Sequence, residues 1–99
     1  MGYLESFQNE LHELCANHNV KSLYSFGSVN TTNFSDESDI DFLVEFSTND
    51  PIEYTEHYFD LKFGLESMFK RPIDLLESKA LKNPYLKDNI DKSKVLVYG

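Results

Sequence analysis

The sequence predicts one α/β domain, and three stretches of its 99 residues carry that prediction. Apolar residues recur at steps of three and four over about residues 3–18 and again over 52–69, which is the spacing of a helix with apolar faces. Between them, residues 39–46 alternate apolar and polar side chains with the period of a β-strand. A chain of this length forms one core. We therefore expect a single domain over residues 1–99.

The first helix is predicted over about residues 3–18. Its apolar stripe consists of Leu4, Phe7, Leu11, Leu14 and His18. The asparagines that flank His18 suit its end, because Asn tolerates the left-handed conformation. A short strand is then predicted over residues 21–26. Gly27 and Ser28 interrupt that strand, and the Thr-, Asn- and Ser-rich stretch 29–38 is expected to form a loop.

The second strand, predicted over residues 39–46, is the clearest in the chain. Its apolar face consists of Ile40, Phe42 and Val44. Because side chains alternate across a strand, Asp39 and Asp41 share the opposite face. Polar residues follow, and Pro51 suits the first turn of the next helix.

The helix predicted over about residues 52–69 is apolar on two sides. One stripe consists of Tyr54, Tyr58, Leu61, Leu65 and Met68, and a second one, nearly opposite, of Ile52, Phe59 and Phe63. Such a helix is either enclosed within its domain or offers one side to a partner. In a domain this small we favour the partner. The helix is therefore the predicted surface for a homo- or hetero-oligomer.

Two short strands complete the prediction. The third is expected over residues 72–76 and carries Asp74, and the last over residues 95–98. Between them, residues 78–89 are expected to form one or two short helical turns, with Pro84 beginning a new one.

The charge balance argues against a chain that grips nucleic acid through its own surface. The net charge is −8 with only nine basic residues, whereas phosphate contacts need clusters of Lys and Arg. No stretch approaches the ~20 apolar residues of a membrane span, and no signal peptide is visible at the N-terminus. Cys15, the single cysteine, lies in a helical pattern as a core residue and cannot form an internal disulfide. We expect a cytoplasmic protein that binds no membrane.

Asp39 and Asp41 are the strongest chemical feature of the sequence. Because both carboxylates share one face of a strand, both can reach one Mg²⁺ ion or a closely spaced pair. Carboxylates held this close repel one another unless a cation is bound. Asp74, on a strand of similar pattern, is the natural third ligand. Taken alone, an Asp-x-Asp pair is more typical of two solvent-facing acids on an edge strand.

Gly27 and Ser28 form a second candidate element. The glycine directly follows a predicted strand, so its backbone can approach a ligand with no Cβ in the way. The Ser28 hydroxyl and the amides after it can bind phosphate oxygens. An ordinary turn at the end of a strand has the same sequence. Bound Mg²⁺ would reverse the local negative charge, so a nucleoside triphosphate is a possible ligand.

The joint pattern is more specific than its parts. Gly27-Ser28, ten residues, Asp39-x-Asp41 and then Asp74 within Pro-Ile-Asp-Leu resembles the minimal nucleotidyltransferase (MNT) family of the DNA polymerase β superfamily. Phe26 before the turn, and the Phe-Leu-Val run after Asp41, fit the strand–turn–strand signature of that family. The resemblance covers nearly the whole chain. It implies a polymerase β-like nucleotidyltransferase core of the α/β (α+β) class, a small mixed β-sheet with flanking helices.

The resemblance also implies an activity. Chains of this size in the family are typically antitoxins of a HEPN-domain ribonuclease toxin, and they use ATP and Mg²⁺ to transfer AMP onto a tyrosine of that toxin. Asp39 and Asp41 would ligate two Mg²⁺ ions. Asp74 would bind the catalytic ion and help to deprotonate the attacking hydroxyl. Gly27 and Ser28 would hold the β- and γ-phosphates.

One departure from the family pattern bears on catalysis. Many relatives carry a small residue and an arginine directly after Gly-Ser, where this chain has Val29 and Asn30. The missing arginine would weaken nucleotide binding or leave its role to a lysine, and the basic pair Lys70 and Arg71 is the best local candidate for contact with phosphate or partner.

Two other functions remain open. The alternative that we favour next is an MNT-fold antitoxin with weak or no catalysis, which neutralises its partner by binding alone. Transfer of a nucleotide onto a small molecule is less favoured, because the additional substrate domain that such enzymes carry is absent from these 99 residues. Direct tailing of RNA is disfavoured by the net charge of −8.

Overall fold

Four strands form a mixed sheet in the order β3-β2-β1-β4. The computed structural model describes residues 3–99. Its strands are β1 (Val20–Phe26), β2 (Ile40–Phe46), β3 (Ile73–Glu77) and β4 (Val95–Tyr98). β1 pairs antiparallel with both β2 and β4, whereas β2 pairs parallel with β3. The predicted small mixed sheet with flanking helices is confirmed.

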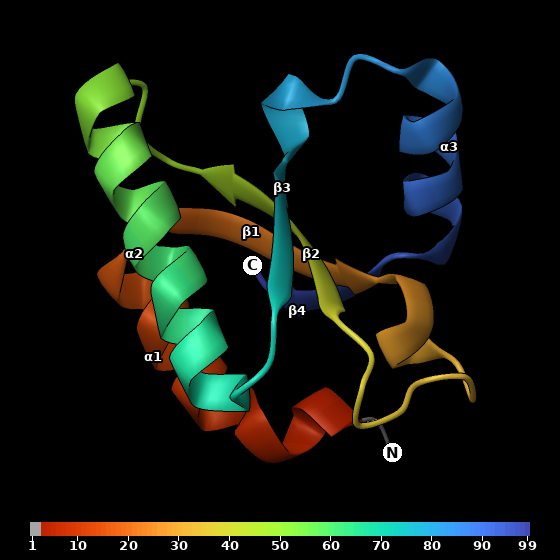
Figure 1. The fold of residues 1–99 in the computed structure, drawn as a ribbon. Helices are drawn as coiled ribbons and strands as arrows, with labels where there is room; N and C mark the ends of the chain where they lie inside the picture. The colour runs from red at the N-terminus through yellow and green to blue at the C-terminus, as the bar shows by residue number, and fades with distance from the viewer. Residues whose placement is uncertain (1–2) are drawn as a thin grey trace.

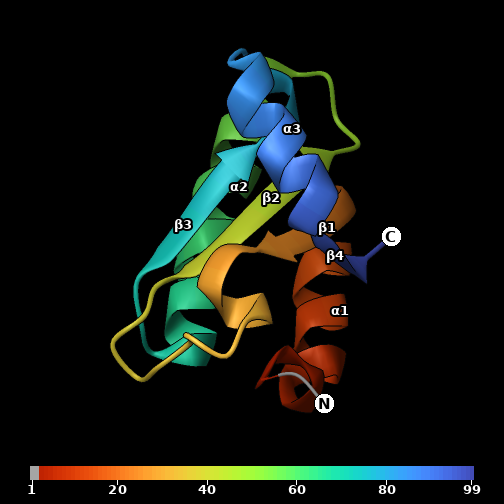
Figure 2. The same ribbon diagram turned by 90° about the vertical axis from the view of Figure 1, so that its right-hand side faces the viewer.

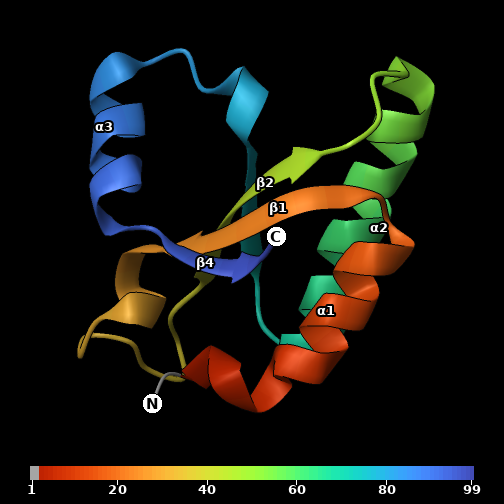
Figure 3. The same ribbon diagram turned by 180° about the vertical axis from the view of Figure 1, so that it is seen from behind.

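Helices cover both faces of this sheet. The α-helices are α1 (Gln8–Asn17), α2 (Pro51–Phe69) and α3 (Pro84–Ser93), and single 3₁₀ turns occupy Tyr3–Phe7, Gly27–Asn30 and Ser78–Ala80. Helices α1 and α2 lie on one side of the sheet and α3 lies on the other (Figure 1, and from behind in Figure 3). Figure 2 shows α3 in front of the sheet and α2 behind it.

The main core fills the space between the sheet and helices α1 and α2. Ile40, Phe42 and Val44 of β2 are fully buried there, as the alternation in their strand predicts. The helices contribute Leu11, Cys15, Leu61, Leu65 and Phe69. Cys15 is fully buried and is a core residue, as expected. Because side chains alternate along a strand, the Asp41 side chain of β2 therefore points away from α1 and α2.

Local sequence signals set the ends of the helices. The Asp50 side chain accepts hydrogen bonds from the backbone N–H groups of Ile52 and Glu53, and Pro51 occupies the first turn of α2. Asn83 and Pro84 repeat this arrangement at the start of α3. Lys70 ends α2 in the left-handed conformation at φ 54°.

The observed elements differ from the predicted ones mainly at their ends. The first helix begins as the 3₁₀ turn Tyr3–Phe7 rather than as α-helix. β2 begins at Ile40 rather than at residue 39, because Ile40 N–H donating to Pro72 O is where pairing with the β3 segment starts. Helix α3 continues to Ser93, beyond the predicted end at 89, and thereby buries Ile90.

The second apolar stripe of α2 faces solvent. Ile52, Phe59 and Phe63 are 73%, 48% and 61% exposed, so the chain itself covers little of this row.

Within residues 3–99, no helix has both the length and the apolar character needed to cross a membrane.

Candidate active site

Asp41 and Asp74 lie side by side on neighbouring strands. They are directly paired in the parallel register of β2 and β3. Both belong to the face that points away from α1 and α2, since Ile40 and Phe42 on either side of Asp41 are buried in the main core. Asp41 is half-buried and Asp74 is exposed. The sequence placed these two acids on separate strands, and the parallel pairing of β2 with β3 brings them side by side.

Asp39 lies just before β2 and is exposed. The pKa of the Asp41 carboxyl is raised above its usual value by burial first, and then by the negative charges of Asp74 and Asp39. The third predicted acid is therefore close enough to act electrostatically on Asp41. Three negative charges gathered here favour a bound cation.

Gly27 approaches this acid pair from β1. Its φ of +76° lies in the region that favours glycine, and a Cβ at this position would collide with Asp41 Oδ2. Phe26, the residue before it, pairs with Asp41 in the antiparallel register of β1 and β2. The turn that contains Gly27 and the half-buried Ser28 therefore begins directly beside the Asp41 carboxylate.

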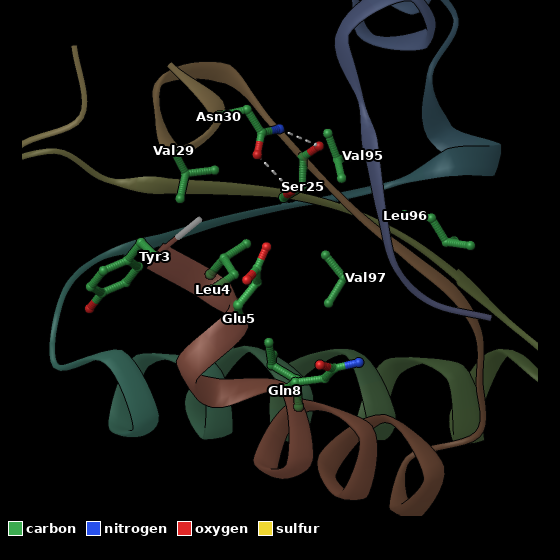
Figure 4. Close-up of a pocket in the computed structure, with 11 residues that line it drawn as sticks. Tyr3, Leu4, Glu5, Gln8, Ser25, Val29, Asn30, Val95, Leu96 and Val97 are labelled. Carbon is green, nitrogen blue, oxygen red and sulfur yellow. Dashed lines mark hydrogen bonds between the residues drawn. The ribbon is translucent and has the colours of Figure 1, made fainter. Parts of the chain in front are cut away.

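Val29 and Asn30 complete this turn and help to fix it. The Val29 side chain is buried. The Asn30 amide donates to Ser25 O at 3.0 Å, and the Ser25 hydroxyl donates to Asn30 Oδ1 at 3.2 Å. The two dashed lines in Figure 4 mark these bonds. Asn30 thus binds the chain itself on the helix side of β1, a contact that sequence patterns alone did not indicate.

A cavity of about 330 Å³ lies on that helix side. Its walls come from the first helical segment, the turn and β4, with Leu4, Ser25, Val29, Asn30 and Val97 among them (Figure 4). Asp39, Asp41 and Asp74 are not among its lining residues. Because Ser25 and Phe42 are paired in register and Phe42 faces the core, this cavity and the acids lie on opposite faces of the sheet. The acids define the candidate active site.

The Arg71 side chain forms hydrogen bonds within the protein, to the loop before β2. Its Nη1 donates to Ser35 O at 3.0 Å and to Ser38 O at 2.9 Å, which ties the loop before β2 to the start of β3. The sequence marked Lys70 and Arg71 only as a basic pair for phosphate or partner. The structure gives Arg71 an internal role.

Comparison with known proteins decides which family this geometry belongs to. The family model described as "Polymerase beta, Nucleotidyltransferase" matches residues 9–99. The chain belongs to the polymerase β nucleotidyltransferase family. The family predicted from the Gly-Ser turn and the three acids is confirmed, and with it the enzyme class.

Individual nucleotidyltransferase relatives agree with this assignment. A Methanocaldococcus jannaschii protein named "Putative protein adenylyltransferase" is 37% identical over 78 residues, which are 79% of this chain and 77% of the relative. A solved structure described as "putative minimal nucleotidyltransferase" matches with a TM-score of 0.76 at 25% identity, over 93% of this chain and 90% of the other. A chain of "tri-AMPylated Shewanella oneidensis HEPN toxin in complex with MNT antitoxin" shares the fold, with a TM-score of 0.65 at 21% identity over 96% and 71% of the two chains.

The acids of this nucleotidyltransferase fit one mode of metal binding. Across residues 3–99, no three His, Cys, Asp or Glu side chains are grouped so as to hold an ion by themselves. Mg²⁺ usually takes one or two carboxylates and fills its other positions with water and substrate phosphates. The adjacent pair Asp41 and Asp74, with Asp39 beside it, suits that mode. The assignment of these acids as ligands stays a prediction.

Proposed function

We propose that this chain transfers AMP from ATP onto a tyrosine hydroxyl of a HEPN-domain ribonuclease toxin, with Mg²⁺ as cofactor, and so acts as an antitoxin in the cytoplasm. The observation that carries this proposal is the pairing of Asp41 with Asp74, with the Gly27 backbone against the Asp41 carboxylate. The name of the M. jannaschii relative supports transfer of an adenylyl group to a protein, and the S. oneidensis complex supports the choice of partner.

Each site residue then has a role set by its position. Asp39, Asp41 and Asp74 would hold the metal, for which two ions are expected. The Gly27 backbone and the Ser28 hydroxyl, at the end of β1 beside Asp41, would bind the β- and γ-phosphates. When bound, Mg²⁺ supplies charge stabilisation at the attacking and leaving oxygens.

The exposed carboxylate of Asp74 is the group that would accept the proton of the tyrosine hydroxyl. The tyrosine oxygen then forms a bond to the α-phosphorus of ATP. The bond from that phosphorus to the bridging oxygen of the β-phosphate breaks, and pyrophosphate leaves with the electron pair. The product is a tyrosine–AMP phosphodiester.

The test is transfer of label from α-³²P-ATP to the purified toxin with and without Mg²⁺. We expect labelled toxin with the wild-type chain and at least about 100-fold less with Asp41→Asn or Asp74→Asn, since metal-binding groups act as a unit in such displacements. Asp88→Asn, an exposed acid on α3 and away from α2, is the matched control and should transfer normally. Equal labelling by the wild-type chain and the Asp41→Asn variant would refute the proposal.

A second function, neutralisation by binding alone, is favoured by the exposed row Ile52, Phe59 and Phe63 on α2. In this case an Asp39→Asn/Asp41→Asn variant still rescues cells that express the toxin. Changing Phe59 and Phe63 to Ser abolishes the rescue, because the exposed apolar area that a partner would cover is lost. Rescue that needs the acids but not the two phenylalanines would exclude this function.

A further inference from the structure

The guanidinium of Arg71 joins three segments of the chain. Besides its bonds to Ser35 O and Ser38 O, its Cζ lies 5.0 Å from the centroid of the Tyr3 ring and 4.6 Å from that of the Phe34 ring. These two rings are themselves in contact, with centroids 5.1 Å apart. Packing against ring faces limits where the guanidinium can move, so its hydrogen bonds have a defined direction.

Arg71 and Pro72 each bind one neighbour of Asp39. Arg71 holds the carbonyl of Ser38, directly before Asp39. Pro72, the next residue in the chain, accepts a hydrogen bond of 3.3 Å from the N–H of Ile40, directly after Asp39. Asp39 lies outside the regular pairing of β2 and is exposed. Its backbone is therefore fixed from both sides by two consecutive residues.

The same two residues lead directly into β3. Asp74 follows Pro72 by two positions and pairs with Asp41. One segment thus sets the place of all three acids: it carries Asp74, aligns Asp41 through the strand register, and fastens the backbone around Asp39.

We propose that Arg71 is a positioning residue, which fixes the backbone around Asp39 so that this acid stays beside Asp41 and contributes to binding a divalent cation. This inference rests on the proposed metal role of the three acids. Arg71 acts through the Ser38 carbonyl rather than through the reacting groups. Loss of an outer partner that orients metal-ligating groups costs about 10- to 100-fold in metal affinity or activity.

The guanidinium is suited to this role and an ammonium is not. A lysine at position 71 keeps the charge but lacks the planar group that lies on the Tyr3 and Phe34 rings while donating to two carbonyls. Arg71→Lys is therefore expected to restore only part of the function lost in Arg71→Met, which keeps the apolar stem and removes every donor. Lys79→Met, an exposed residue beyond the other end of β3, is the control for the loss of one positive charge.

Two measurements test the proposal. Hydrogen exchange of the Ile40 amide reports on the backbone next to Asp39. Titration with Mn²⁺ in the presence of a non-hydrolysable ATP analogue, followed by electron paramagnetic resonance, reports on metal binding without turnover. We expect Arg71→Met to exchange faster at Ile40 and to bind Mn²⁺ at least about 10-fold more weakly, Arg71→Lys to be intermediate, and Lys79→Met to match the wild type.

The outcomes separate this inference from the proposed function. Wild-type Mn²⁺ affinity in Arg71→Met, even with a lowered melting temperature, would show that Arg71 only stabilises the fold and would overturn the inference. Unchanged exchange at Ile40 would overturn it as well. If the wild-type chain bound no Mn²⁺, the metal role of the acids would fail, while the exchange rates would still decide whether Arg71 fixes the backbone around Asp39.

Discussion

Replacing Asp41 by Asn should stabilise the metal-free protein. The Asp41 carboxyl has a raised pKa, because burial disfavours its ionised form and because Asp74 and Asp39 repel its charge. At neutral pH the folded chain therefore holds an unfavourable carboxylate that the unfolded chain exposes to water. Asn is close in size and shape to Asp, so the contact with Gly27 is retained while the charge is removed.

The expected size follows from the strand register. Paired residues on neighbouring strands are separated by about 4.8 Å, and two unit charges at about 5 Å repel by roughly 0.8 kcal/mol in water and about 3 kcal/mol at an effective dielectric constant of ~20. Asp74 is exposed, so the lower value applies. For a domain of this size, ~1 kcal/mol raises the melting temperature by about 4–8 °C.

The assay is thermal unfolding of wild type and Asp41→Asn over a range of pH without metal. The wild type should lose stability relative to the variant as the pH rises from the ordinary Asp range, about 3.9, through the raised pKa of Asp41. Below that range the two should unfold alike. Mg²⁺ with an ATP analogue should raise the melting temperature of the wild type far more than that of the variant. A variant less stable than wild type at pH 7, or a difference that persists in acid, would refute this reasoning.

Three further predictions concern the backbone turn, the core and a helix start. Gly27→Ala should abolish transfer and lower the melting temperature, because φ is +76° and the new Cβ meets Asp41 Oδ2; wild-type activity would contradict the described contact. Cys15 should resist alkylation at pH 8 in the folded chain, since burial raises its pKa to about 12, and mass spectrometry should find it modified only in denaturant. Asp50→Ala should destabilise the chain by about 1 kcal/mol in urea unfolding, because α2 loses the cap at Ile52 and Glu53; an unchanged midpoint would show that the cap is dispensable.

Much of the fold could be predicted because its signals are local. Alternation in β2 placed Ile40 and Phe42 in the core and Asp41 on the other face, and Pro51 marked the start of α2. The pairing of Asp41 with Asp74 could not be derived in this way, since it depends on a parallel register across a whole crossover helix.

The part of the site that sequence patterns missed is held by long-range polar contacts. Nothing near Arg71 in the sequence indicates that its guanidinium binds carbonyls in the loop before β2, because those carbonyls are brought there only by the folded chain. In the same way, Asn30 was noted only as standing where many relatives carry an arginine, and its bonds to Ser25 depend on the shape that the turn adopts. Asp39 was predicted inside a strand, and it lies one residue before it because pairing begins at Ile40.

The strand order has a consequence for a chain that is still being synthesised. β1 and β2, the middle strands, are made first, and β3 and β4 are added at the two edges in the order in which they leave the ribosome. Asp39 and Asp41 therefore exist for a time on a nascent sheet that has no Asp74. Under the proposed mechanism such a chain cannot transfer a nucleotide. Modification of a partner therefore begins only after β3 has paired with β2 and brought Asp74 beside Asp41.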